Sequence, residues 1–343
     1  MTDETRQVAA VYVQTNEPEA NRVLSFGRGD DGALTPRGSY ETGGAGDGVP
    51  HLTSQGSVVL SGDERHLFVT NAGSGDLTLF SVAAGVLDLV GNIQTGAAPK
   101  SVAEHGGLVY VLNTGAPSLA GFRLGEGGLE PLAGSARDLG EGSDPAQVGF
   151  SPDGSTLVVT ERGTDAIVLY PVRPDGLLGE PHVQPSSGPT PYGFAFTTGG
   201  TLVVTEAFGA QTGKAAASSY RLNGGSITPV SRSIGNGRSE ICWAVVTKDD
   251  RYALTTNFAD GAVSRFAITA DGALALEDAV AGVAVEGRPG LRDEDLTGDG
   301  RFLYAIDADG GRIYGWTVGE GGALSPIGSW NGLPATAAGL AAG

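Results

Sequence analysis

Residues 156–170 read TLVVTERGTDAIVLY, two apolar runs joined by a short polar segment. Similar stretches are HLFVTNAGSGDLTLF from His66, LVYVLNTGAPSLAGF from Leu108 and RYALTTNFADGAVSRF from Arg251. Apolar runs of this length with alternating side chains are typical of β-strands, and the Gly- and Asp-rich segments between them are typical of turns. Each stretch therefore predicts two antiparallel strands joined by a turn.

The same pattern recurs along the whole chain and can be followed by the polar residue that ends the first run of each repeat. These residues are Asn16, Asn71, Asn113, Glu161, Glu206, Asn257 and Asp307. Successive members are 42 to 55 residues apart, close to the ~40 to 50 residues of a four-stranded propeller blade. The repeats predict an all-β fold: a seven-bladed β-propeller of four-stranded blades, forming one domain over residues 1–343.

The fourth repeat illustrates the expected blade. An inner strand is predicted at 145–150, followed by strands at 156–160 and 166–170 and an outer strand around 181–184. The N-terminal repeat, AAVYVQTN from Ala9, starts with a second-strand pattern and lacks an inner strand, whereas LPATAAGLAAG from Leu333 can supply one. We expect these two segments to pair within one blade, which closes the ring and removes an open sheet edge.

Composition excludes several classes of function. With 21 Lys and Arg against 39 Asp and Glu, the net charge is −18, which disfavours binding to nucleic acid or to an anionic membrane. The single cysteine, Cys242, allows no intramolecular disulfide and no cysteine cluster for a metal. The first ten residues lack the features of a signal peptide, and no run of 18 apolar residues occurs. We expect a cytoplasmic protein that needs no metal or cofactor.

The up-and-down topology predicts which loops share a face. The connections from outer to inner strands and the turns between second and third strands emerge together, on a face that we call the front; the other turns lie on the back. The acidic turns at 151–154, 249–250 and 298–300 are therefore expected on the back. Because Asp-Gly suits a tight hairpin, we interpret them as turns in preference to a calcium site.

The units similar to SPDGxxLVVTE, seven in the chain, resemble those of the lactonase family of seven-bladed propellers, which includes propeller-type 6-phosphogluconolactonase and carboxy-cis,cis-muconate cyclase. The resemblance implies a metal-independent lactone hydrolase or a lactonising isomerase. It also implies an active site with Pro-Arg-His at an inner-strand entrance, a glutamate at the end of the next strand, and further arginines. Here the corresponding segments read Pro145-Ala146-Gln147 and Thr160-Glu161-Arg162, without that arginine and histidine, and 240–243 also lacks arginine.

The predicted catalytic residues lie at the front. Glu161 and Glu206 end second strands in adjacent blades, where a pair of carboxylates would raise one pKa and provide a base. The alternative is that each bonds to backbone N–H groups at its turn, as Asn does in the other repeats. His51 is the one histidine of four that the topology places in a front connection, and it is expected either as a catalytic group or as a loop residue that bonds to carbonyls.

Amide, aromatic and charged residues at the inner-strand entrances form the predicted substrate site. They are Gln55, Lys100, Gln147, Tyr192, Trp243, Arg292 and Asp293. The aromatic members are alternatively packed between blades. The run Arg292-Asp293-Glu294-Asp295 puts four charges on an inner strand, so these residues either line a wet channel or form ion pairs that lock the blades.

The sequence thus predicts an enzyme that opens or forms a small cyclic ester at the front mouth of the channel. Its expected partner is a small molecule, such as a lactone or a carboxylate, and the sequence indicates no oligomeric state. The alternative function is a non-catalytic propeller that binds a small molecule or a protein through the same face.

Overall fold

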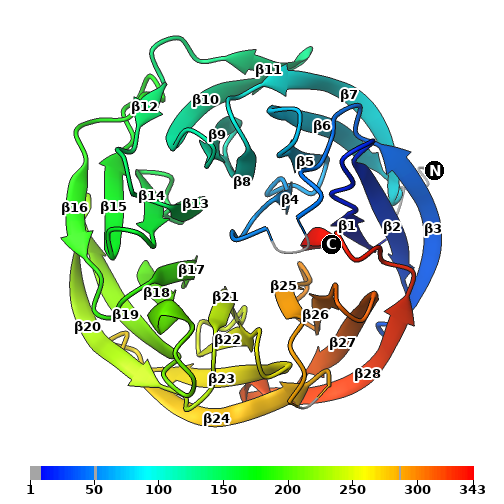
Figure 1. Ribbon diagram of the computed structural model, residues 1–343. Helices are drawn as coiled ribbons and strands as arrows, with labels where there is room; N and C mark the ends of the chain where they lie inside the picture. The colour runs from blue at the N-terminus through cyan, green and yellow to red at the C-terminus, as the bar shows by residue number, and fades with distance from the viewer. Residues whose placement is uncertain (1–8, 50–51, 286) are drawn as a thin grey trace, which may run out of the picture.

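The computed structural model describes residues 9–49, 52–285 and 287–343 of the chain. These residues form 29 β-strands arranged as seven sheets around an axial channel (Figure 1). Helical structure in the described residues is limited to two 3₁₀ turns, η1 (Phe208–Ala210) and η2 (Glu320–Gly322). The predicted all-β, seven-bladed propeller is confirmed. None of the described helices is long and apolar enough to cross a membrane.

Each blade runs outward from the channel as an antiparallel meander. The strands of the first three blades, from inner to outer, are β29 (Ala338–Ala342), β1 (Ala10–Gln14), β2 (Arg22–Arg28) and β3 (Leu34–Glu41); β4 (Val58–Leu60), β5 (His66–Asn71), β6 (Asp76–Ala83) and β7 (Val86–Gln94); and β8 (Pro99–His105), β9 (Leu108–Asn113), β10 (Ser118–Gly125) and β11 (Gly128–Pro131). In the third blade a short strand, β12 (Arg137–Asp138), also pairs with β10.

The other four blades follow the same order. Their strands are β13 (Pro145–Phe150), β14 (Thr156–Glu161), β15 (Ala166–Pro171) and β16 (His182–Pro185); β17 (Pro191–Phe196), β18 (Thr201–Glu206), β19 (Ala216–Asn223) and β20 (Ser226–Gly235); β21 (Ile241–Val246), β22 (Tyr252–Asn257), β23 (Ala262–Ile268) and β24 (Leu274–Val283); and β25 (Leu291–Leu296), β26 (Phe302–Asp307), β27 (Arg312–Val318) and β28 (Leu324–Asn331). The fourth blade has the four strands expected from its sequence.

The apolar core is divided among the interfaces between blades. Seven larger clusters of buried side chains each span two adjacent blades. In β14, Leu157 and Val159 pack toward the third blade, whereas Val158 packs toward the fifth. Successive side chains of a strand point to opposite faces, so an apolar run buried on both faces serves two interfaces at once.

The ring is closed by the C-terminal strand, as predicted. Strand β29 pairs antiparallel with β1, with Val11 opposite Ala342 and Val13 opposite Leu340. All four side chains join a cluster that also contains Ile306 of the seventh blade. Figure 1 shows the red β29 beside the dark blue β1.

The acidic back-face turns make the contacts of hairpin turns. The Ser61 hydroxyl donates to Asp63 (2.7 Å) and accepts the His66 amide (3.0 Å), and Asp63 accepts the Arg65 amide (3.1 Å). The corresponding bonds recur around Asp153, Asp249 and Asp299. No group of three His, Cys, Asp or Glu residues within the described ranges is arranged to hold a metal.

Deleting residues 334–343 is expected to abolish soluble folding, because it removes β29, exposes the edge of β1 and opens the cluster shared with the seventh blade.

Ala341→Glu, which places a carboxyl in a fully buried position beside Tyr12, should lower the free energy of unfolding by at least ~2 kcal/mol. Solubility and thermal melting measure both effects, with Ser325→Ala on the exposed outer strand as control. Unchanged melting of the truncated chain would refute this mode of closure.

Candidate functional site

The front end of the channel is filled by the segment 52–56, which lies between β3 and β4. Leu52 is buried against Ala72 and Ala338. The Ser54 hydroxyl donates to the Lys100 carbonyl (2.6 Å), and the Trp243 indole N–H donates to the Ser54 carbonyl (3.0 Å). In Figure 1 this part of the chain crosses the centre of the ring. We call it the channel plug.

Gln55 joins the plug to several blades. Its side-chain amide makes two bonds with the backbone of Ala244 in the sixth blade, donating to the carbonyl (2.9 Å) and accepting from the N–H (3.1 Å). Its backbone N–H donates to the Ala146 carbonyl (3.2 Å), and its carbonyl accepts the Ser101 hydroxyl (2.6 Å). The plug therefore connects the second, third, fourth and sixth blades across the axis.

A cavity of about 340 Å³ lies behind the plug. Gln55 and Trp243 form its front end, and the later residues of the inner strands, including Leu60, Glu104 and Asp295, surround its other end and are partly exposed. The cavity therefore opens toward the back. This differs from the open front mouth expected from the sequence, because the path of the plug across the axis is not part of the repeating pattern.

Asp293 is the most distinctive group in the cavity. Its side chain is 3% exposed, and its Oδ2 atom has no hydrogen-bond partner among the described residues. Burial raises the pKa of Asp293 to about 7, against the opposing effects of the Gly339 amide, the Arg292 guanidinium and the Trp243 indole. A buried carboxyl with one unpartnered oxygen and a pKa near neutrality can accept and return a proton at physiological pH.

Three further carboxyl groups line the same cavity. Asp295 accepts bonds from the amides of Ala342 (2.9 Å) and Leu296 (2.8 Å), and burial raises its pKa to about 6. Neither oxygen of Glu294 has a hydrogen-bond partner within the described ranges, and burial raises its pKa well above its usual value. Glu104, at the back, accepts bonds from the amides of Gly107 (2.7 Å) and Gly62 (3.2 Å).

The two predicted glutamines also border the cavity. Gln147 makes a pair of bonds with the backbone of Phe194, donating to its carbonyl (3.1 Å) and accepting from its N–H (2.6 Å). A primary amide has two N–H donors, and the bonds made by Gln55 and Gln147 use one each. Both side chains are thus held in place, and the second N–H of each donates no hydrogen bond within the described residues.

The predicted pair of glutamates makes separate sets of contacts. Glu206 is fully buried and accepts bonds from Ser218 (2.6 Å), Ser233 (2.6 Å) and the Gly188 amide (2.8 Å). Glu161 accepts the Thr164 hydroxyl (2.6 Å), and burial raises its pKa. None of these contacts joins the two carboxylates. The Gly188 amide matches the expected backbone alternative for Glu206, whereas the other bonds come from hydroxyl groups.

Asn71 illustrates the structural role of this position in another repeat. It donates to Asp76 (2.6 Å) and Thr78 (2.7 Å) in its own blade, and accepts from Asn21 (2.9 Å) and Thr42 (2.8 Å) of the preceding blade. The residue at this position of the repeat therefore ties the end of the second strand to its neighbours.

The predicted cationic residues have acidic partners outside the cavity. Lys100 pairs with Asp47 (3.2 Å), and Arg292 pairs with Asp309 (3.0 Å) while lying 4.9 Å from the centre of the Phe258 ring. In the run 292–295 the three acidic residues line the cavity, as one alternative expected, whereas the ion pair of Arg292 with Asp309 lies within the seventh blade and does not join two blades.

Tyr192 is buried beside Trp243, with ring centres 5.8 Å apart, and its hydroxyl has no hydrogen-bond partner in the described part of the chain. Tyr192 thus fits the packing alternative, whereas Trp243 both packs against it and lines the cavity. The predicted catalytic residue His51 lies outside the described residues. Glu104 was not among the predicted site residues; its signal in the sequence is an acid in the inner strand PKSVAEH, where most other inner strands are apolar.

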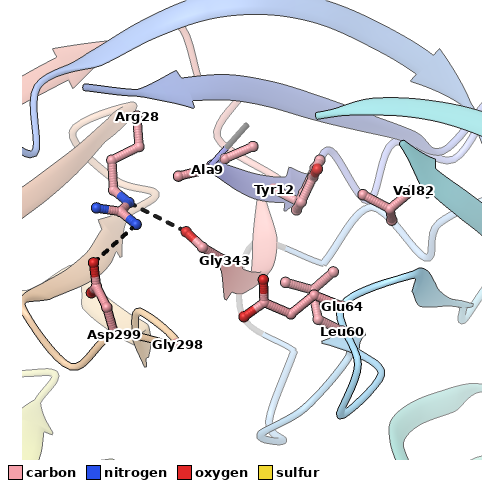
Figure 2. A pocket seen from close by; sticks show the side chains of 10 residues that line it. Ala9, Tyr12, Arg28, Leu60, Glu64, Val82, Gly298, Asp299 and Gly343 are labelled. Atoms are coloured by element: carbon pink, nitrogen blue, oxygen red, sulfur yellow. Dashed lines mark hydrogen bonds and ion pairs between the residues drawn. The ribbon is translucent and has the colours of Figure 1, made fainter. Parts of the chain in front are cut away.

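A second pocket, of about 190 Å³, lies on the back beside the closing strand (Figure 2). Arg28 reaches across it, donating to the carbonyl of Gly343 (3.2 Å) and pairing with Asp299 (3.4 Å). Leu60 lines this pocket and the axial cavity, so the two adjoin.

Comparison with known proteins gives a family and a set of similar folds. A family model described as "Lactonase, 7-bladed beta-propeller" matches residues 127–208 and 202–337, which is more than half of the chain. No curated protein sequence matches significantly.

Among solved structures, a provisionally assigned 6-phosphogluconolactonase of Bacteroides fragilis is 19% identical, with 100% of this chain and 99% of that chain covered and a TM-score of 0.75. A periplasmic gluconolactonase of Pseudomonas aeruginosa is also 19% identical, with 98% and 99% covered and a TM-score of 0.75. A Lactobacillus plantarum protein is 17% identical, with 98% and 99% covered and a TM-score of 0.76. At these identities the similarity shows the fold.

The buried Asp293 makes a prediction about stability. Because its pKa rises from 3.8 to about 7 on folding, the folded state prefers the protonated form, and stability is lost as the pH rises from about 4 through 7. The Asp293→Asn variant has no carboxyl group to ionise at this position. At pH 8 its free energy of unfolding should therefore exceed that of the native chain by up to about 4 kcal/mol. At pH 4 the difference between the two should be much smaller.

Denaturant unfolding at both pH values measures this difference. The matched control is Asp63→Asn, because the Ser61 hydroxyl lowers the pKa of Asp63, and its removal should instead reduce stability at pH 8. An equal effect of Asp293→Asn at pH 4 and pH 8 would contradict the assignment of a raised pKa.

Proposed function

Because the chain belongs to the lactonase family of seven-bladed β-propellers, we propose that it hydrolyses a small cyclic ester in the axial cavity. The observation that carries the proposal is the unpartnered, buried carboxyl oxygen of Asp293 in a cavity that two fixed amide side chains, Gln55 and Gln147, also line. The cavity volume of about 340 Å³ lies within the range of small-molecule sites.

Lactone hydrolysis requires a base for water, a donor for the developing oxyanion and a proton for the leaving oxygen. Asp293 in its ionised form takes a proton from water as the water oxygen bonds to the lactone carbonyl carbon. The second N–H groups of Gln55 and Gln147 stabilise the oxyanion of the tetrahedral intermediate. When the ring C–O bond breaks, Asp293 returns the proton to the leaving oxygen, and the product is a hydroxy acid.

The front-face residues have a supporting part in this proposal. Trp243 and the backbones of Lys100 and Ala244 hold the plug, and the plug excludes water from one end of the cavity. Glu161 and Glu206 secure the turns of their blades. A base in the interior of the channel replaces the predicted front-face carboxylate pair.

A second candidate is a propeller that binds a small molecule in the same cavity without turnover. The support for this candidate is the inner-strand entrance Pro145-Ala146-Gln147. It lacks the arginine and histidine that the family resemblance implies for the active site. Tight binding of an unhydrolysed lactone by folded protein would favour it over hydrolysis.

Asp293→Asn is expected to lower kcat by ~10² to 10⁴-fold, the usual contribution of a general base. Proton release from a panel of five- and six-membered lactones, corrected for spontaneous opening, measures it. Asp153→Asn, in the back-face turn of the fourth blade, is the control and should leave kcat within about twofold. If Glu161→Gln abolishes activity while Asp293→Asn retains it, the base is Glu161.

The proposed base also sets the pH dependence. The pKa of Asp293 is raised to about 7 and the ionised form is the active one, so kcat/KM should rise with pH and reach half of its plateau near pH 7. Initial rates between pH 5 and 9, with the spontaneous rate subtracted at each pH, test this. A profile that is flat over this range would remove Asp293 from the role of base.

A further inference from the structure

We propose that the lactone opened in the axial cavity carries neither a phosphate nor a carboxylate group. This inference rests on the proposed hydrolysis and specifies its substrate class. Of the two ligand classes expected from the sequence, a lactone or a carboxylate, it retains the lactone.

The charge of the cavity wall is the first argument. Four carboxyl side chains, Glu104, Asp293, Glu294 and Asp295, line the cavity, and none of its described lining residues is Lys, Arg or His. An anionic substituent inside this cavity would have no counter-ion among the lining residues in a partly desolvated space, and it would repel each of these carboxyl groups that is ionised. An uncharged ring meets no such penalty.

The path by which a substrate enters the cavity is the second argument against an anionic substrate. The plug fills the front end, and the partly exposed Glu104 and Asp295 stand at the back end, toward which the cavity opens. Both are held by backbone amides, Glu104 by those of Gly107 and Gly62 and Asp295 by those of Ala342 and Leu296. A substrate therefore passes two fixed acidic side chains before it reaches Asp293.

Three of the nearby cations are paired with carboxylates, whereas the exposed Lys248 acts electrostatically on Asp295 at the back end. Lys100 pairs with Asp47 and Arg292 with Asp309, outside the cavity. In the adjoining back pocket, Arg28 is held by Asp299 and the Gly343 carbonyl (Figure 2). Recognition of a phosphate or carboxylate ordinarily uses an available Arg or Lys, which these ion pairs do not provide.

The groups that remain suit a neutral polar ring. The second N–H donors of Gln55 and Gln147 match carbonyl and hydroxyl oxygens. Trp243 lines the same end of the cavity and provides an apolar surface for the ring. A hydroxylated lactone such as a sugar lactone combines both properties.

The test compares glucono-δ-lactone with its 6-phosphate, which share the ring and the reacting bond. We expect kcat/KM for the uncharged lactone to be at least about 10-fold higher, and the ratio to shrink as salt is raised from ~0.02 to ~0.5 M, because salt screens the repulsion. The double variant Glu104→Gln/Asp295→Asn should narrow the ratio at least threefold. Asp153→Asn, in a back-face turn outside the cavity lining, should leave the ratio unchanged.

The outcomes separate this inference from the proposed function. Equal or faster opening of the 6-phosphate would overturn the inference and leave the hydrolysis intact. A ratio that persists in the double variant and in high salt would show that size and not charge discriminates, and would also overturn it. If the folded protein opens neither of these two lactones and no other lactone in the panel, both the proposed hydrolysis and this inference are rejected.

Discussion

The pairing of β29 with β1 is the interaction on which the rest of the structure depends. Each blade buries its two faces against its neighbours, so an open ring would leave two apolar faces exposed. The closing strand also reaches the site: the Gly339 amide acts on Asp293, and the Ala342 amide bonds to Asp295. Closure therefore completes the last interface and contributes to the wall of the axial cavity.

The channel plug makes the two ends of the axial channel different, because it fills the front end and leaves the back end open. Gln55 bonds to Ala244 on the far side of the axis, and Ser54 accepts the indole N–H of Trp243. A tunnel through a propeller would be wet along its length, whereas a channel filled at one end encloses groups in a less polar surrounding. That surrounding raises the pKa of Asp293. The plug, through Gln55 and Gly56, and the closing strand, through Leu340, thus both contribute to the wall of the cavity.

The sequence could predict the ring but only part of the site, and the reason is physical. Strand alternation and blade length repeat, so they identified the fourth-blade strands and the closing strand at residues 338–342. Gln55 and Gln147 were predicted to bind substrate because they stand at inner-strand entrances, and both border the cavity. The plug repeats nowhere, and Glu206 owes its role to serines in three different segments. Such contacts between distant segments leave no local pattern.

The buried acidic strand has opposing consequences for folding and for catalysis. The burial that brings the pKa of Asp293 to about 7 favours the folded state only while the group is protonated. A general base acts only in the ionised form, so the pH range in which the cavity can work is the range in which it destabilises the fold. The seven apolar interfaces offset this cost, because most of their buried side chains lie outside the cavity wall. Ala103, Val148 and Leu340 are among the residues that belong to both. A propeller can therefore carry an uncompensated carboxyl at its axis because its stability resides at the blade interfaces around it.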